Sequence, residues 1–275
     1  MNLAPRSARF AAAALLALLP AATHPALASG RRPATRITVF AAASLAEAFT
    51  EIGHDFESSH PGLSVRFDFE GSQQLAAQLE RGAAADVFAT ADQRWMADVQ
   101  SHGLLAGDPR PFARNHLVLI VPATNPGRIH ALPDLARRGL KLVVGADAVP
   151  VGHYTRELLA RLERVDGYGP AFRRSVLANV VSEEENVKAV VGKVQLGEAD
   201  AGFVYRSDVS SSVARYVRVI EPPDSAQVLA TYPIAPLAHA PDPALAGDFV
   251  AYVLGPGGRR TLQRHGFLPA EAPAP

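Results

Sequence analysis

Small or polar residues stand at four places where an apolar run of the sequence ends and a helical pattern begins. These places are Ser44, Ser72, the segment Val149–Gly152 and Asn186. A helix start offers backbone N–H groups without intrahelical partners, at the positive end of the helix dipole. The simplest reading of any single start is a helix cap, and Ser44-x-x-Glu47 in particular predicts a capping box. Four such starts that converge on one cleft would instead form an anion site built from neutral donors.

The motifs of hydrolysis, metal binding and nucleotide binding are absent from the sequence. There is no G-x-S-x-G, no H-E-x-x-H and no P-loop. The nine histidines form no i, i+4 pair and there is no cysteine, so we predict no cation ligands, no cofactor and no lipid anchor. One alternative stays open, an exported serine hydrolase that uses Ser44 or Ser72 as nucleophile and a histidine as base. We expect a protein that is not an enzyme.

The charges of the chain balance, with 27 Lys and Arg against 27 Asp and Glu among 275 residues. Nucleic-acid-binding proteins carry a basic excess on one face, so we expect no nucleic-acid partner. The length suits about one or two domains with a substantial core.

The first 28 residues have the pattern of a secretory signal peptide. Arg6 and Arg9 precede the apolar run Phe10–Leu19, and Ala26–Ala28 supplies the small-residue cleavage site. No later segment approaches the roughly 20 apolar residues of a transmembrane helix. We therefore predict a protein that is exported without a lipid anchor and located in the periplasm. The Pro- and Ala-rich residues 271–275 are expected to be a disordered tail.

Short β-branched runs alternate with helical patterns along the rest of the chain. Strands are predicted at residues 37–43, 63–69, 86–90, 116–121, 140–145, 176–181 and 201–205. Between them, apolar residues recur at helical spacing, as Leu45, Phe49, Ile52 and Phe56 do. This alternation predicts an α/β protein with mostly parallel sheets.

Six short runs in a fixed order resemble one protein family. They are Val39–Leu45, Ala85–Asp92, Glu184–Lys188, Leu196–Tyr205, Tyr232–Ile234 and Arg264–Phe267. Together they make the chain similar, from about residue 37 to residue 267, to the ModA-type periplasmic molybdate-binding proteins of ABC importers. The resemblance implies a two-lobed periplasmic binding protein fold in which each lobe is a mostly parallel sheet flanked by helices. We expect residues 36–115 plus 237–270 in one lobe and residues 116–236 in the other, with the lobes closing on the ligand.

The resemblance also implies a site for a tetrahedral oxyanion, molybdate and also tungstate. Its donors would be two serine hydroxyls, two backbone amides and one phenol, at Ser44, Ser72, Val151, Val187 and Tyr205. A site of neutral dipoles selects mainly by cavity size, so we expect rejection of the smaller sulfate. A sulfate- or phosphate-binding protein is the alternative. The implied partner is an inner-membrane ABC permease, and we expect a monomer.

Two stretches near these positions depart from what the family often carries. Glu70, Gln73 and Gln74 surround the second serine, where small or hydroxyl residues are usual. A desolvated carboxylate would oppose a dianion by several kcal/mol. Glu70 is therefore expected to face away from the site unless the ligand differs.

The second departure is the acidic run Glu183–Glu185. Ser182-x-x-Glu185 could itself be a capping box, and a helix beginning at Ser182 would use the amide of Val187 internally. On the resemblance we favour Asn186 as the cap.

Overall fold

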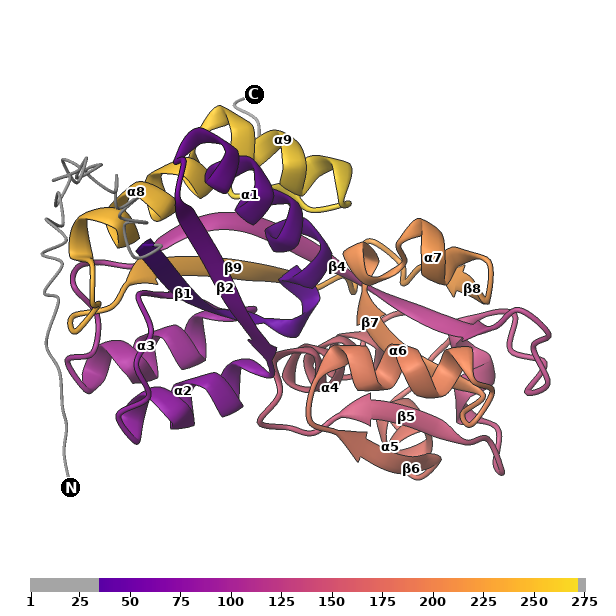
Figure 1. Cartoon of the computed structure of the whole chain (residues 1–275). Helices are drawn as coiled ribbons and strands as arrows, with labels where there is room; N and C mark the ends of the chain where they lie inside the picture. Colours follow the sequence, from indigo (N-terminus) through magenta and orange to yellow (C-terminus); the bar gives the residue numbers. More distant parts are fainter. Residues whose placement is uncertain (1–34, 272–275) are drawn as a thin grey trace, which may run out of the picture. The chain divides into compact units, whose positions relative to one another are not determined.

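The computed structural model describes residues 35–271 (Figure 1). The predicted signal peptide, residues 1–28, and residues 272–275 of the predicted tail lie outside this range. Within it, no helix has the length and apolar character needed to cross a membrane.

Two groups of strands form the framework. The first group comprises β1 (Thr35–Ala42), β2 (Leu63–Glu70), β3 (Val87–Ala89), β9 (Leu229–Pro236) and β10 (Leu268–Pro269). The second comprises β5 (Leu142–Gly145), β6 (Val180–Glu184), β7 (Ala201–Tyr205) and β8 (Val217–Ile220). The long strand β4 (Arg110–Pro122) belongs to both. Its residues Arg110–His116 pair with β9, and its residues Leu117–Ile120 pair with β7.

Each sheet has a parallel core of three strands, in the order β2-β1-β3 in the first sheet and β6-β5-β7 in the second. Strands β9 and β4 extend these cores in antiparallel directions. The α/β class is therefore confirmed, and the parallel part of each sheet is the part that the strand–helix alternation predicted. The residues of β1 are buried from Val39 to Ala42, as expected for a parallel strand with both faces covered.

Helices cover the first sheet on both faces (Figure 1). One face carries α1 (Ala46–Ser59), α8 (Pro243–Leu254) and α9 (Pro256–Arg264), and the other carries α2 (Ser72–Glu80) and α3 (Gln93–Ser101). The core accordingly divides into two apolar clusters. Phe49, Ile52 and Phe56 of α1 lie in the larger one, and Leu75 and Leu79 of α2 lie in the smaller one.

Helices α4 (Pro150–Leu162) and α6 (Val187–Gln195) pack against the second sheet, beside α5 (Phe172–Leu177) and α7 (Ser211–Ala214). Residues 35–271 also form three short 3₁₀ turns, η1 (Ala43–Leu45), η2 (Leu132–Ala136) and η3 (Arg206–Asp208).

The strand predicted at residues 176–181 exists, but the prediction places its start four residues too early. Residues up to Leu177 belong to α5, where Phe172 and Val176 are both buried on one helical face, and the strand β6 begins at Val180. Val180–Glu184 alternates in exposure as the edge strand of its sheet, which is why this polar stretch could form a strand.

The sheet pairing also differs from the expected lobe boundary near residue 236. Strand β9 pairs with β3 and with the first part of β4, so it lies in the first sheet. We call residues 35–116 with 229–271 the first half of the chain, and residues 117–228 the second half. The movement of two lobes stays a prediction.

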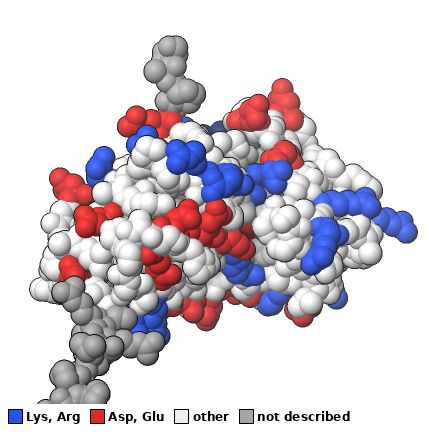
Figure 2. All heavy atoms as spheres, turned by 45° about the horizontal axis from the view of Figure 1, so that its top comes forward, with Lys and Arg blue, Asp and Glu red and all other residues white. Residues whose placement is uncertain are grey.

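Acidic and basic side chains are mixed on the face that Figure 2 shows, with acidic ones gathered near its middle and basic ones beside them. A continuous basic surface, which nucleic-acid binding requires, is not present on that face.

Candidate functional site

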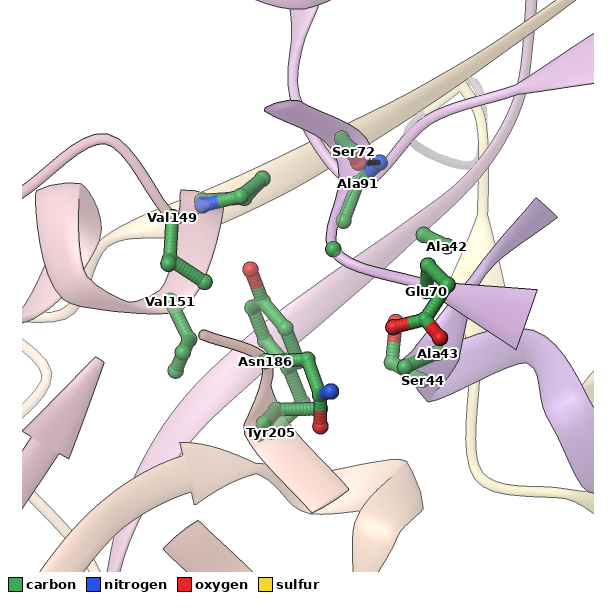
Figure 3. Close-up of a pocket in the computed structure, with 13 residues that line it drawn as sticks. Ala42, Ala43, Ser44, Glu70, Ser72, Ala91, Val149, Val151, Asn186 and Tyr205 are labelled. Atoms are coloured by element: carbon green, nitrogen blue, oxygen red, sulfur yellow. Dashed lines mark hydrogen bonds between the residues drawn. The ribbon is translucent and has the colours of Figure 1, made fainter. Parts of the chain in front are cut away.

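A pocket of about 210 Å³ lies where the first and second halves meet. All five expected donors line it, namely Ser44, Ser72, Val151, Val187 and Tyr205. Figure 3 shows Ser44, Ser72 and Glu70 on one side, with Val149, Val151 and Asn186 on the other.

Two buried serines come from the first half. Ser44 lies in η1, directly after β1, and its Oγ is 3.1 Å from the Tyr232 hydroxyl. Ser72 is the first residue of α2, and its Oγ accepts a hydrogen bond of 3.1 Å from the Ala91 amide. Because that bond uses Ser72 Oγ as an acceptor, the hydroxyl proton of Ser72 is free to be donated to a ligand.

The predicted capping role of Ser44 is wrong. The chain leaves β1 through the buried turn η1, the N-cap of α1 is Leu45, and that cap makes no side-chain hydrogen bond. Ser44 turns toward Tyr232 instead, and Glu47 pairs with Lys188. Ser72 is likewise the first helical residue, with Gly71 at the N-cap position.

Backbone amides come from two helix starts in the second half. Helix α4 begins at Pro150, which has no N–H, so Val151 offers the first amide of that helix. At α6, Asn186 is the N-cap, and its Oδ1 accepts from the Ala189 amide at 3.0 Å. The amide of Val187 is therefore left without an intrahelical partner. Asn186 is confirmed as the cap, and the Ser182 alternative is wrong because Ser182 lies inside β6.

Tyr205 ends β7 and is 1% exposed. Its hydroxyl has no hydrogen-bond partner among residues 35–271, and in Figure 3 it points into the space between Val149 and Ala91. Burial raises the pKa of this phenol well above its ordinary value, so the group is a proton donor at neutral pH. A buried hydroxyl without a partner costs about 1–3 kcal/mol, which an acceptor placed in the pocket would offset.

Glu70 ends β2 and lines the pocket, so it does not face away as expected. Desolvation raises the pKa of its carboxyl, and the neighbouring charges of Asp68 and Glu185 raise it further. It is the one charged side chain among the lining residues, and no Lys or Arg accompanies it. The pocket is thus a set of neutral donors with one carboxylate at its edge.

The acidic run Glu183–Glu185 is largely neutralised by partners of its own. Glu183 pairs with Arg156 at 2.5 Å, and Glu184 pairs with Lys193 at 2.6 Å.

Glu185 contacts the first half of the chain. Its carboxylate accepts from Gln74 Nε2 at 3.1 Å, and its carbonyl accepts from Gln73 Nε2 at 2.7 Å. Gly71 allows this approach, because a Cβ at that position would collide with the carbonyl of Glu185. The two glutamines therefore join the halves beside the pocket.

A second contact joins the halves at the opposite helix start. Trp95 Nε1 donates to the Ala148 carbonyl at 2.8 Å, and Arg94 donates to the same carbonyl at 2.7 Å. Ala148 lies two residues before Pro150, the first residue of α4. The environment of this single tryptophan therefore depends on how the halves meet.

Sequence reasoning missed the role of Tyr232. This residue is fully buried, touches Ser44, and stacks edge-on against Tyr205 with ring centroids 5.7 Å apart. The run Tyr232–Ile234 indicated only the family resemblance. A short run of sequence does not reveal that Tyr232 contacts Ser44, which lies 188 residues away.

A possible metal-binding group lies outside the pocket. Glu80, Asp98 and His102 bring one ligand atom each within 4.8 Å of one another, at the surface of α2 and α3. Asp98 lies in the last turn of α3, and His102 is the residue that caps its C-terminus. Because exposed acidic groups cluster commonly, this group by itself indicates no cation.

Comparison with known proteins gives a family and a fold. A family model described as bacterial extracellular solute-binding protein matches residues 37–268. The molybdate-binding protein ModA of Mycobacterium tuberculosis is 47% identical over 234 residues, covering 85% of this chain and 85% of that protein.

Two solved structures share the fold. The periplasmic molybdate-binding protein of Azotobacter vinelandii has a TM-score of 0.70 at 20% identity, covering 84% of this chain and 98% of that one. The sulfate-binding protein SubI of Mycobacterium tuberculosis has a TM-score of 0.75 at 18% identity, covering 86% and 87%. The fold alone therefore does not separate molybdate from sulfate.

Proposed function

The chain belongs to the bacterial extracellular solute-binding proteins, and on this basis we propose that it captures molybdate and delivers it to an ABC importer. The proposed ligand donors are the hydroxyls of Ser44, Ser72 and Tyr205 and the amides of Val151 and Val187. The proposed partner is an inner-membrane permease of that importer.

The observation that carries the proposal is the Tyr205 hydroxyl, which has no partner among residues 35–271 and lies in a pocket of neutral donors. A tetrahedral dianion can accept hydrogen bonds from several directions at once, and preorganised hydroxyls and amides stabilise it without a counter-charge. The free hydroxyl proton of Ser72 and the free amides at the starts of α4 and α6 supply donors of this kind.

Tungstate is nearly the same size as molybdate, so we propose that the same donors hold it. Sulfate is smaller and would contact fewer donors at once in a pocket fitted to molybdate. Hydrogen phosphate is the second candidate, because its O–H could donate to Glu70 at the edge of the pocket.

We propose that the protein has no catalytic role. Ser44 contacts a tyrosine hydroxyl and Ser72 contacts a backbone amide, whereas a serine nucleophile needs a histidine beside it. No histidine is among the described residues that line the pocket. The family membership favours an extracytoplasmic protein, and we propose the periplasm and a monomeric state.

Titration calorimetry on the chain without residues 1–28 tests the function. We expect tight binding of molybdate and tungstate, and binding of sulfate and phosphate weaker by at least tenfold. Fluorescence of Trp95 should change on titration, since its indole contacts the loop that precedes α4. Tighter binding of phosphate than of molybdate would favour the second candidate, and no binding of any of the four anions would refute the proposal.

A further inference from the structure

Lys188 directly follows Val187 and carries an ammonium that contacts two carboxylates. Its Nζ lies 2.9 and 2.8 Å from the two carboxylate oxygens of Glu47, on α1. The same Nζ lies 3.1 Å from Asp208 Oδ1, in η3. Lys188 does not line the pocket. Its charge therefore acts on the site from outside.

Asp208 is the partner of Lys188 within the second half of the chain. The Asp208 side chain is fully buried, and its Oδ2 accepts from the Tyr205 amide at 3.1 Å. Desolvation raises the pKa of Asp208, and Lys188 opposes this rise. Removal of the ammonium would leave a buried carboxylate without a counter-charge, which strongly destabilises a fold.

Glu47 is the partner of Lys188 from the first half of the chain. Its carboxylate is 41% exposed, and the side chain of Lys188 is 29% exposed. Among the ion pairs of residues 35–271, this is the one that joins the two halves. Hydrogen bonds other than ion pairs also join the halves. Gln73, Arg94 and Trp95 donate to backbone carbonyls of the second half. Gln74 donates to the Glu185 carboxylate, and Asn115 donates to the Ser207 hydroxyl.

The three charged groups are attached to segments that carry proposed ligand donors. Glu47 follows Ser44 by three residues, Lys188 follows Val187, and Asp208 follows Tyr205 by three residues. An ammonium that holds both carboxylates thus fixes the positions of a donor from the first half and two donors from the second.

We propose that Lys188 is a positioning residue that latches the closed site through Glu47. This inference rests on the proposed function and adds to it a source of slow ligand release. While the halves are apart, Lys188 neutralises the charge of Asp208. When the halves meet, Lys188 also forms an ion pair with Glu47. The latch does not touch the oxyanion, and it is charge-based and partly exposed, so salt weakens it.

The variant Glu47→Gln tests the latch without exposing Asp208. Stopped-flow fluorescence of Trp95 would follow the release of molybdate at low and high salt. We expect release to be roughly 3- to 10-fold faster than in the wild type at low salt, as for loss of a partly exposed ion pair. We also expect the salt dependence of release to be reduced. The ligand-free melting temperature should stay within about 2 °C, because Glu47 is not needed to neutralise Asp208.

Glu51→Gln is a matched control. Glu51 lies one turn further along α1 with 39% exposure, and it pairs with Arg264 and His265, both of the first half. Its loss should leave release unchanged, and Glu47→Asp should restore part of the slow release. Wild-type release and salt dependence in Glu47→Gln would overturn the latch.

Failure of the proposed function gives a different result. If the wild type bound no oxyanion, the function would be refuted, and X-ray scattering of the ligand-free proteins would still test the latch. A larger radius of gyration in Glu47→Gln than in Glu51→Gln would support it. If the wild type bound no oxyanion and the two variants had equal radii of gyration, the latch would be overturned.

Discussion

Replacement of Tyr205 by phenylalanine removes one oxygen from the centre of the pocket and keeps the ring. The ring should keep its edge-on packing against Tyr232, which has a centroid distance of 5.7 Å. A hydrogen bond to a charged acceptor contributes about 1.5–3 kcal/mol, so molybdate binding should weaken roughly 10- to 150-fold.

The stability of the ligand-free protein should change in the opposite direction. The hydroxyl is buried without a partner among the described residues, so its removal relieves an unsatisfied polar group. We expect ligand-free Tyr205→Phe to be as stable as the wild type or up to about 1 kcal/mol more stable. A packing residue would not show this combination of weaker binding and undiminished stability.

Calorimetric titration and ligand-free thermal melts measure the two effects. Tyr168→Phe is a suitable control, because Tyr168 packs against Phe172 and does not line the pocket. It should bind molybdate as the wild type does. Wild-type affinity in Tyr205→Phe, together with a lower ligand-free melting temperature, would refute the assignment of Tyr205 to the site.

Three further expectations concern Ser44, Glu70 and export. Ser44→Ala should weaken molybdate binding and lower the unfolding free energy by about 0.5–1.5 kcal/mol, the value of the lost contact with Tyr232, as thermal melts would measure. Burial raises the pKa of Glu70, and its charged form repels a dianion. Affinity should therefore rise as pH falls toward that pKa, until molybdate itself protonates, and calorimetry across pH should find no such rise in Glu70→Gln. Mass spectrometry of the exported protein should find Ser29 at the N-terminus, and a retained 1–28 segment would contradict the predicted cleavage.

The alternation of strands and helices was predictable from the sequence because the spacing of apolar residues within a few neighbouring positions distinguishes a strand from a helix. Buried parallel strands favour continuous apolar runs, and Val39–Ala42 is such a run. The five site residues came from a resemblance in motif order, and the structure brings all five to one pocket. Their role as ligand donors stays a proposal.

The errors have a common physical origin in contacts between distant residues. Ser44-x-x-Glu47 has the spacing of a capping box, but Ser44 meets Tyr232 and Glu47 meets Lys188, which are 188 and 141 residues away. Likewise, no local rule shows that Glu70 lines the pocket rather than facing solvent. Contacts between residues so far apart in the sequence depend on how the sheets assemble, which short-range patterns do not record.

The passage of β4 from one sheet to the other affects how the chain can be assembled during synthesis. In the first sheet, β9 lies between β3 and β4 and pairs with both. Because β9 comes late in the sequence and ends at Pro236, it is made long after its two neighbours. A ribosome that makes the chain from its N-terminus therefore leaves one edge of β3 unpaired until the whole second half and then β9 have emerged. Unpaired strand edges invite aggregation. The nascent protein thus has a long interval in which its first sheet is incomplete and open to pairing with other chains.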